Sequence, residues 1–223
     1  MKRKHERTRQ MIGRAQKYNH LISWPSALCV LALVMPLNLA LFGDLQGTWI
    51  LAVLGFSSLF NAFAVLGTGI LSGVGLQKRA AFLVLGAAII KIPLNIILVT
   101  NIGLIGAAIS SLLVYGLLAG ANVVLIKSRY SFAAFPKGTG TYIVSGVLTG
   151  ALIGIPTLFF DVEAWSRIEA FAYVIVSIPA GIAFYGGLVW KFNGSGDFHG
   201  IPVIGRLVDK IERKERRETR VME

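Results

Sequence analysis

Long apolar runs separated by short polar connections are the main pattern along this chain. Six runs with few charged side chains occupy residues 21–42, 48–72, 80–100, 103–126, 141–160 and 169–190. About 20 apolar residues in a helix cross the hydrocarbon core of a bilayer. The pattern therefore predicts an all-α membrane protein of six transmembrane helices. Because the loops are short, each helix is predicted to be antiparallel to its neighbour in sequence.

Basic residues alternate between the connections and indicate the topology. Seven of the 22 Lys and Arg residues lie in residues 1–20, and eight lie from Lys191 onward. The loops after the second and fourth runs are also basic, whereas those after the first and third runs contain no Lys or Arg. Residues 161–169 hold three acids and one arginine. The positive-inside rule therefore predicts that both termini are cytoplasmic and that the protein lies in the inner cell membrane.

Composition supports a membrane protein and argues against several other classes. The chain is 55% hydrophobic and 15% charged, whereas soluble domains average about 45–50% and about 25%. A net charge of +11 would favour nucleic acid on a soluble surface, but here the charge is concentrated at the ends, so no nucleic-acid partner is predicted. Cys29 is the single cysteine, and no catalytic, P-loop or metal-ligand spacing occurs. The sequence predicts no enzyme, no cofactor and no metal site.

The two ends differ from the apolar centre. Residues 1–20 form a basic cytoplasmic flank, and residues 191–223 form a basic cytoplasmic tail. Four apolar residues of the tail fall on one helical face: Ile204, Leu207, Val208 and Ile211. Such a segment is typical of an amphipathic helix on the membrane surface. The alternative is a solvated helix held by acid–base pairs four residues apart.

Glycines repeat every four residues in the fifth run, at Gly146, Gly150 and Gly154. Small residues on one helix face let a neighbouring backbone approach closely, so these three are predicted to pack against another helix. Such a smooth face also suits helices that slide during transport.

Two prolines lie inside predicted spans, Pro36 and Pro93. A proline removes a backbone hydrogen bond and bends a helix, so both are predicted kink sites. In lipid the freed carbonyl, which for Pro93 belongs to Ile89, needs another donor. Lys91 or Asn95 is a candidate for that structural task.

Candidate chemistry centres on Lys91, in the middle of the third run. A lysine at the bilayer centre costs about 2.5–3.5 kcal/mol and is a functional-site hypothesis by default. Asn95 shares its helix face, and Ser57 and Asn61 share a face of the preceding helix. The pattern indicates a hydrated cavity for an anionic ligand such as a phosphate or pyrophosphate. The alternatives are a snorkelling or structurally paired lysine and ordinary hydrogen bonds between helices.

Three motifs in the centre of the chain resemble a known family. They are GILSGVGLQKRA at residues 69–80, KIPLN at 91–95 and NIGLIGAAISSLLVYG at 101–116. These are similar to the second half of polysaccharide-biosynthesis flippases, the stage V sporulation protein B-like family of the multidrug/oligosaccharidyl-lipid/polysaccharide exporter superfamily. The opening of the first apolar run and the start of the tail resemble the same family.

The resemblance implies part of a two-lobed transporter that works by alternating access. Residues 21–126 would form four helices of the second lobe, and residues 127–190 would form two extra helices. By this likeness the two extra helices contribute a groove for a lipid tail, and Lys91 and Asn95 occupy positions where the family often has lysine and asparagine. The first lobe would be a missing N-terminal half, supplied by a longer chain or a separate polypeptide.

The predicted function is therefore part of a flippase for a lipid-linked oligosaccharide, with membrane lipid and a polyprenyl-diphosphate-linked saccharide as partners. One alternative is a drug or small-cation exporter of the same superfamily. Such exporters tend to carry an intramembrane acid, and no Asp or Glu lies in the interior of the six runs. Another alternative is a truncated membrane protein that does not transport.

Overall fold

The computed structural model describes residues 2–130 and 135–193, and these residues form helices and no strands. The α-helices are α1 (Lys2–Ala32), α2 (Val34–Phe42), α3 (Thr48–Gly73), α4 (Gln77–Ile102), α5 (Leu104–Lys127), α6 (Thr139–Phe159) and α7 (Arg167–Asn193), with a short 3-10 helix at Val162–Ala164. This confirms the all-α class. The predicted amphipathic segment of the tail lies outside the described residues.

Five helices, α3 to α7, are long and apolar enough to cross a membrane. The bent pair of α1 and α2 brings the number to six if the two helices form one span. The chain is therefore a multi-pass membrane protein, and five of the six predicted runs correspond to single unbroken helices.

The first predicted span differs from a single straight helix. Helix α1 runs from Lys2 to Ala32, so it includes nearly all of the basic flank as well as the start of the first apolar run. The chain then bends by 68° between α1 and α2, at Leu33. Pro36 lies in the first turn of α2 and has no N–H to bond to the carbonyl of Ala32 four residues earlier. The break thus falls just before the predicted kink residue.

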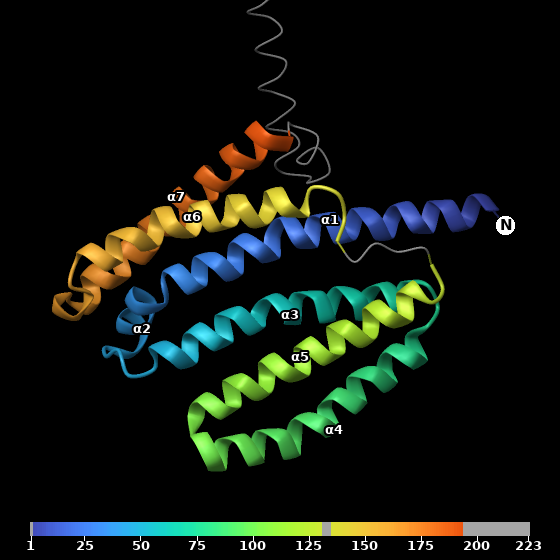
Figure 1. Cartoon of the computed structure of the whole chain (residues 1–223), viewed down its shortest axis with the longest axis horizontal. Helices are drawn as coiled ribbons and strands as arrows, with labels where there is room; N and C mark the ends of the chain where they lie inside the picture. The colour runs from blue at the N-terminus through green and yellow to red at the C-terminus, as the bar shows by residue number, and fades with distance from the viewer. Residues whose placement is uncertain (1, 131–134, 194–223) are drawn as a thin grey trace, which may run out of the picture.

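The helices lie side by side in a curved row, in the order α7, α6, α1, α3, α5, α4 (Figure 1). The α2 segment turns away from the axis of α1 and packs against α7. The start of α1, the α3–α4 turn, the end of α5 and the start of α6 lie at one end of the helices (Figure 1). The α2–α3, α4–α5 and α6–α7 connections share the other (Figure 1). The first end carries the basic connections and the second the acidic one, as the alternation of charge predicts.

A tight hairpin joins α4 to α5 and sets their register. Gly103 has φ +69°, in the left-handed region, and is both the end of α4 and the cap of α5. A Cβ added at Gly106 would lie 2.4 Å from the backbone carbonyl of Leu98. The two helices therefore touch backbone to backbone next to the turn, and their side chains meet further along the pair.

Candidate functional site: a polar seam between α4 and α5

Lys91 is a partly buried cation near the middle of α4. At 1.5 Å per residue it lies about 21 Å from Gln77 and about 16 Å from Ile102 along the helix axis. Its Nζ lies 3.4 Å from the hydroxyl of Tyr115 on α5 and 4.8 Å from the centre of the Tyr115 ring. The hydrogen bond is long, and the face of the ring adds a cation–π interaction with the ammonium group. One donor of the ammonium group is thus used, and its other N–H groups can serve a ligand.

Asn95 lies one turn further along α4 and contacts α5 as well. Its Oδ1 lies 3.0 Å from the hydroxyl of Ser110, which also lies 2.9 Å from the carbonyl of Ala107. Ser110 is fully buried. The amide NH₂ group of Asn95 takes no part in this contact, so it can donate to a ligand.

These two contacts follow directly from the hairpin register. Counting back from the turn, Leu98 meets Gly106, Asn95 meets Ser110 and Lys91 meets Tyr115. We call the last two pairs the polar seam. It places one cation, one amide and two hydroxyl groups along the interface of two helices whose other residues are mostly apolar. Such a set favours an anion with several hydrogen-bond acceptors, as a phosphate or carboxylate has.

The two predicted site residues of α3 are not part of the seam. Ser57 is buried, and its hydroxyl donates to the carbonyl of Leu54 in its own helix at 2.8 Å. Asn61 is partly buried. Among the hydrogen bonds of the described residues, none joins Lys91 or Asn95 to either side chain.

The predicted structural task for Lys91 and Asn95 at Pro93 does not appear in these contacts. Helix α4 runs through Pro93 without a break, and the two side chains contact α5 rather than the carbonyl of Ile89.

Sequence reasoning missed Asn122, a fully buried amide on α5. Its Nδ2 donates to the carbonyl of Ala64 at 2.9 Å and to the hydroxyl of Thr68 at 3.1 Å, both on α3. A Cβ added at Gly67 would lie 2.6 Å from the Asn122 side chain, so the amide fits against a glycine. This contact fixes α5 on α3. Its sequence signal was a lone asparagine within an apolar helix.

The three predicted packing glycines of α6 lie against α1. Added Cβ atoms at Gly146, Gly150 and Gly154 would lie within 2.9 to 3.3 Å of α1 atoms, from Leu28 and Ala32. The glycine stripe therefore forms the surface on which α1 rests.

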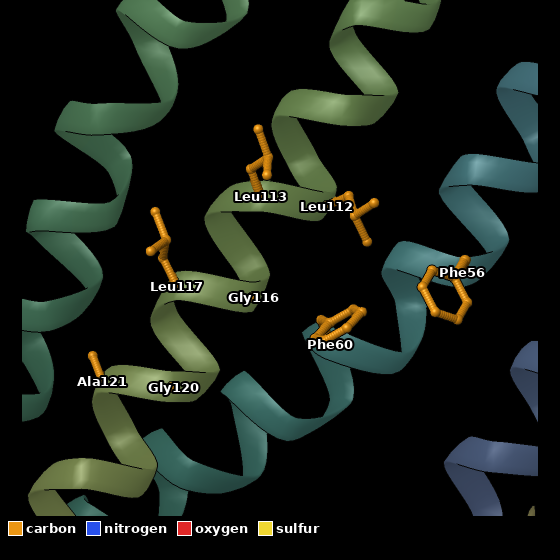
Figure 2. A pocket seen from close by; sticks show the side chains of 8 residues that line it. All are labelled: Phe56, Phe60, Leu112, Leu113, Gly116, Leu117, Gly120 and Ala121. Carbon is orange, nitrogen blue, oxygen red and sulfur yellow. The ribbon is translucent and has the colours of Figure 1, made fainter.

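An apolar groove lies between α3 and α5. It is distinct from the lipid-tail groove that the resemblance implies, which would involve α6 and α7. It has a volume of about 650 Å³ and opens widely to the outside. Figure 2 shows its lining: Phe56 and Phe60 on α3, and Leu112, Leu113, Gly116, Leu117, Gly120 and Ala121 on α5. The groove suits hydrocarbon and offers nothing to a polar headgroup.

His20, the last residue of the basic flank, is buried in α1. Its Nδ1 accepts a hydrogen bond from the indole N–H of Trp24 at 3.1 Å. Its ring centre lies 4.7 Å from that of Phe63 and 5.6 Å from that of Phe135. The residue thus joins α1, α3 and the segment before α6. Within the described part of the chain, no group of three or more His, Cys, Asp or Glu residues is arranged to hold a metal ion.

Comparison with known proteins identifies a relative without a described activity. The chain is 29% identical over 100 residues to "Uncharacterized membrane protein YabM" of Bacillus subtilis (strain 168). The match covers 45% of this chain and 19% of the relative, so the chain matches about a fifth of that protein's length. No family model and no solved structure matches the chain.

Proposed function

We propose that this chain is part of a flippase that moves a lipid-linked oligosaccharide, a polyprenyl-diphosphate-linked saccharide, across the cell membrane. The observation that carries the proposal is the polar seam, with Lys91 held near mid-depth of an apolar helix pair. An uncompensated cation there is costly, and the contact with Tyr115 uses a single donor of it. A pyrophosphate or a headgroup carboxylate supplies the missing negative charge.

The residues of the seam have distinct tasks in this proposal. Lys91 attracts the anion, and Tyr115 holds the ammonium group at its level in the helix pair. The amide of Asn95 donates to the headgroup, while Ser110 fixes the orientation of that amide through its oxygen. No covalent bond forms or breaks. The lipid tail stays in hydrocarbon, for which the α3–α5 groove offers an apolar surface.

The resemblance to two-lobed flippases supports this assignment, and it implies that a second lobe faces this one. In the proposal that lobe, on the same or another polypeptide, closes the cavity and permits alternating access. The membrane-protein relative supports the membrane location but describes no substrate.

A transport assay tests the proposal. The native gene product, with any partner lobe that purifies with it, is reconstituted into proteoliposomes that contain a fluorescent polyprenyl-diphosphate-linked saccharide. Flipping is measured as the change in fluorophore accessibility to a membrane-impermeant quencher. We expect flipping in the wild type, near-complete loss in Lys91→Met and partial retention in Lys91→Arg at equal protein level. Absence of flipping in the wild type, or unchanged flipping in Lys91→Met, overturns the proposal. Export of small cations by the same vesicles would favour the exporter alternative.

A further inference from the structure

The face of α1 that packs against α6 continues toward the N-terminus, beyond the start of α6. Pro25, Leu28 and Ala32 meet the glycine stripe of α6 along this face. The same alternating spacing of three and four residues, continued toward the N-terminus, reaches Arg14 and Met11. Both are exposed, and Met11 is 68% exposed. Helix α6 thus covers the apolar part of the face and leaves its cationic continuation open.

The start of α6 and the end of α7 meet next to this uncovered face. A Cβ added at Gly138, the cap of α6, would lie 3.2 Å from Nδ2 of Asn193, the last residue of α7. Lys137 precedes that glycine and Lys191 lies two residues before that asparagine, and both are exposed. Two lysines from distant parts of the sequence therefore lie near the contact between the start of α6 and the end of α7.

Helix α1 also lies next to this contact between α6 and α7. Tyr18 of α1 and Trp190 of α7 both pack against the core cluster that joins α1, α6 and α7. Arg14 lies one turn before Tyr18 on the same face of α1. Three exposed cationic residues thus lie around the place where α1, α6 and α7 meet, at the basic end of the protein: Arg14, Lys137 and Lys191. We call this set the cationic corner.

We propose that the cationic corner is a binding site for the phosphate of an anionic phospholipid in the cytoplasmic leaflet. The positive-inside rule places this end at that leaflet, whose anionic lipids attract clustered Lys and Arg. Tyr18 and Trp190 are side chains that favour the headgroup level. Glu6 is the acid nearest to the corner on α1, about 12 Å along the helix from Arg14. The site is separate from the polar seam, which lies near mid-depth.

Lipid titration followed by native mass spectrometry tests this proposal on the full chain in detergent. The probes are phosphatidylglycerol and the zwitterionic phosphatidylcholine. The corner variant combines Arg14→Gln, Lys137→Gln and Lys191→Gln. We expect the wild type to bind phosphatidylglycerol more tightly than phosphatidylcholine, and the corner variant to bind phosphatidylglycerol at least about tenfold more weakly.

A control variant removes the same charge from the other side of the same end, through Lys78→Gln, Arg79→Gln and Lys127→Gln. We expect it to lose less than about threefold in affinity for phosphatidylglycerol. A charge-conserving variant with Arg14→Lys, Lys137→Arg and Lys191→Arg retains binding and shows that folding is intact. Equal losses in the corner and control variants, or no loss in the corner variant, overturn the site.

Discussion

Substitution of Tyr185 by Phe tests how α7 supports a proline-containing helix. Pro25 has no N–H, so the carbonyl of Leu21, four residues earlier, loses its helical donor. The hydroxyl of Tyr185 lies 2.8 Å from that carbonyl and donates to it in a buried site. Tyr185→Phe keeps the ring and leaves the carbonyl without this donor. Hydrogen bonds between helices in membranes average about 0.6 kcal/mol with a maximum near 1.7, and an orphaned buried acceptor costs about 1–3. We expect a loss of about 1–2 kcal/mol in the free energy of unfolding.

Tyr173 provides a matched control on the same helix. Its hydroxyl donates to the carbonyl of Ile153 at 2.6 Å, but that carbonyl also has the N–H of Thr157 as its ordinary helical partner. Tyr173→Phe should therefore cost less than about 1 kcal/mol. Unfolding in mixed micelles with increasing dodecyl sulfate, followed by circular dichroism, measures both variants. Equal losses, or a larger loss in Tyr173→Phe, would refute the reasoning about Pro25.

Three further substitutions test the packing among α3, α4 and α5 by the same unfolding measurement. Gly106→Ala places a methyl group 2.4 Å from the Leu98 carbonyl, so we expect it to destabilise by about 1–3 kcal/mol and to disturb the hairpin register. Gly69→Ala has open space within 4 Å and should be neutral or stabilising by up to about 1 kcal/mol; a loss comparable to that of Gly106→Ala would contradict the packing argument. Asn122→Ala removes the contact with the α3 carbonyl and with Thr68, and should cost about 1–2 kcal/mol; an unchanged stability would show that the amide does not fix α5 on α3.

The number and type of elements were predictable because apolar length is a strong signal. Five of the six predicted runs are single helices, since a span of about 20 apolar residues leaves little freedom in its boundaries. The prediction of a kink at Pro36 came within three residues of the observed bend at Leu33. Pro36 has no N–H to bond to the carbonyl four residues earlier, so the helix is interrupted before the proline. The continuation of α1 through the basic flank was not predicted, because most residues there are charged or polar. Only a narrow face of this part of the helix is buried, and it includes Ile12 and Gln16. Ile12 packs in a cluster with residues of α3 and α5.

The candidate site was predictable only within one helix. The i, i+4 spacing of Lys91 and Asn95 placed both on one face of α4, and the structure shows both contacting α5. Their partners Tyr115 and Ser110 were not predicted, because the register of the hairpin depends on the backbone contact at Gly106. The cationic corner was also invisible, since its members come from three segments far apart in the sequence.

Ligand binding at the polar seam tests the central claim most directly. Equilibrium binding of a polyprenyl diphosphate is compared with that of the uncharged polyprenol of the same chain length, for the purified chain in nanodiscs. The account predicts that the wild type prefers the diphosphate by at least about tenfold, and that Lys91→Met abolishes this preference while Lys91→Arg and the corner variant keep it. The same preference in Lys91→Met as in the wild type would contradict the account.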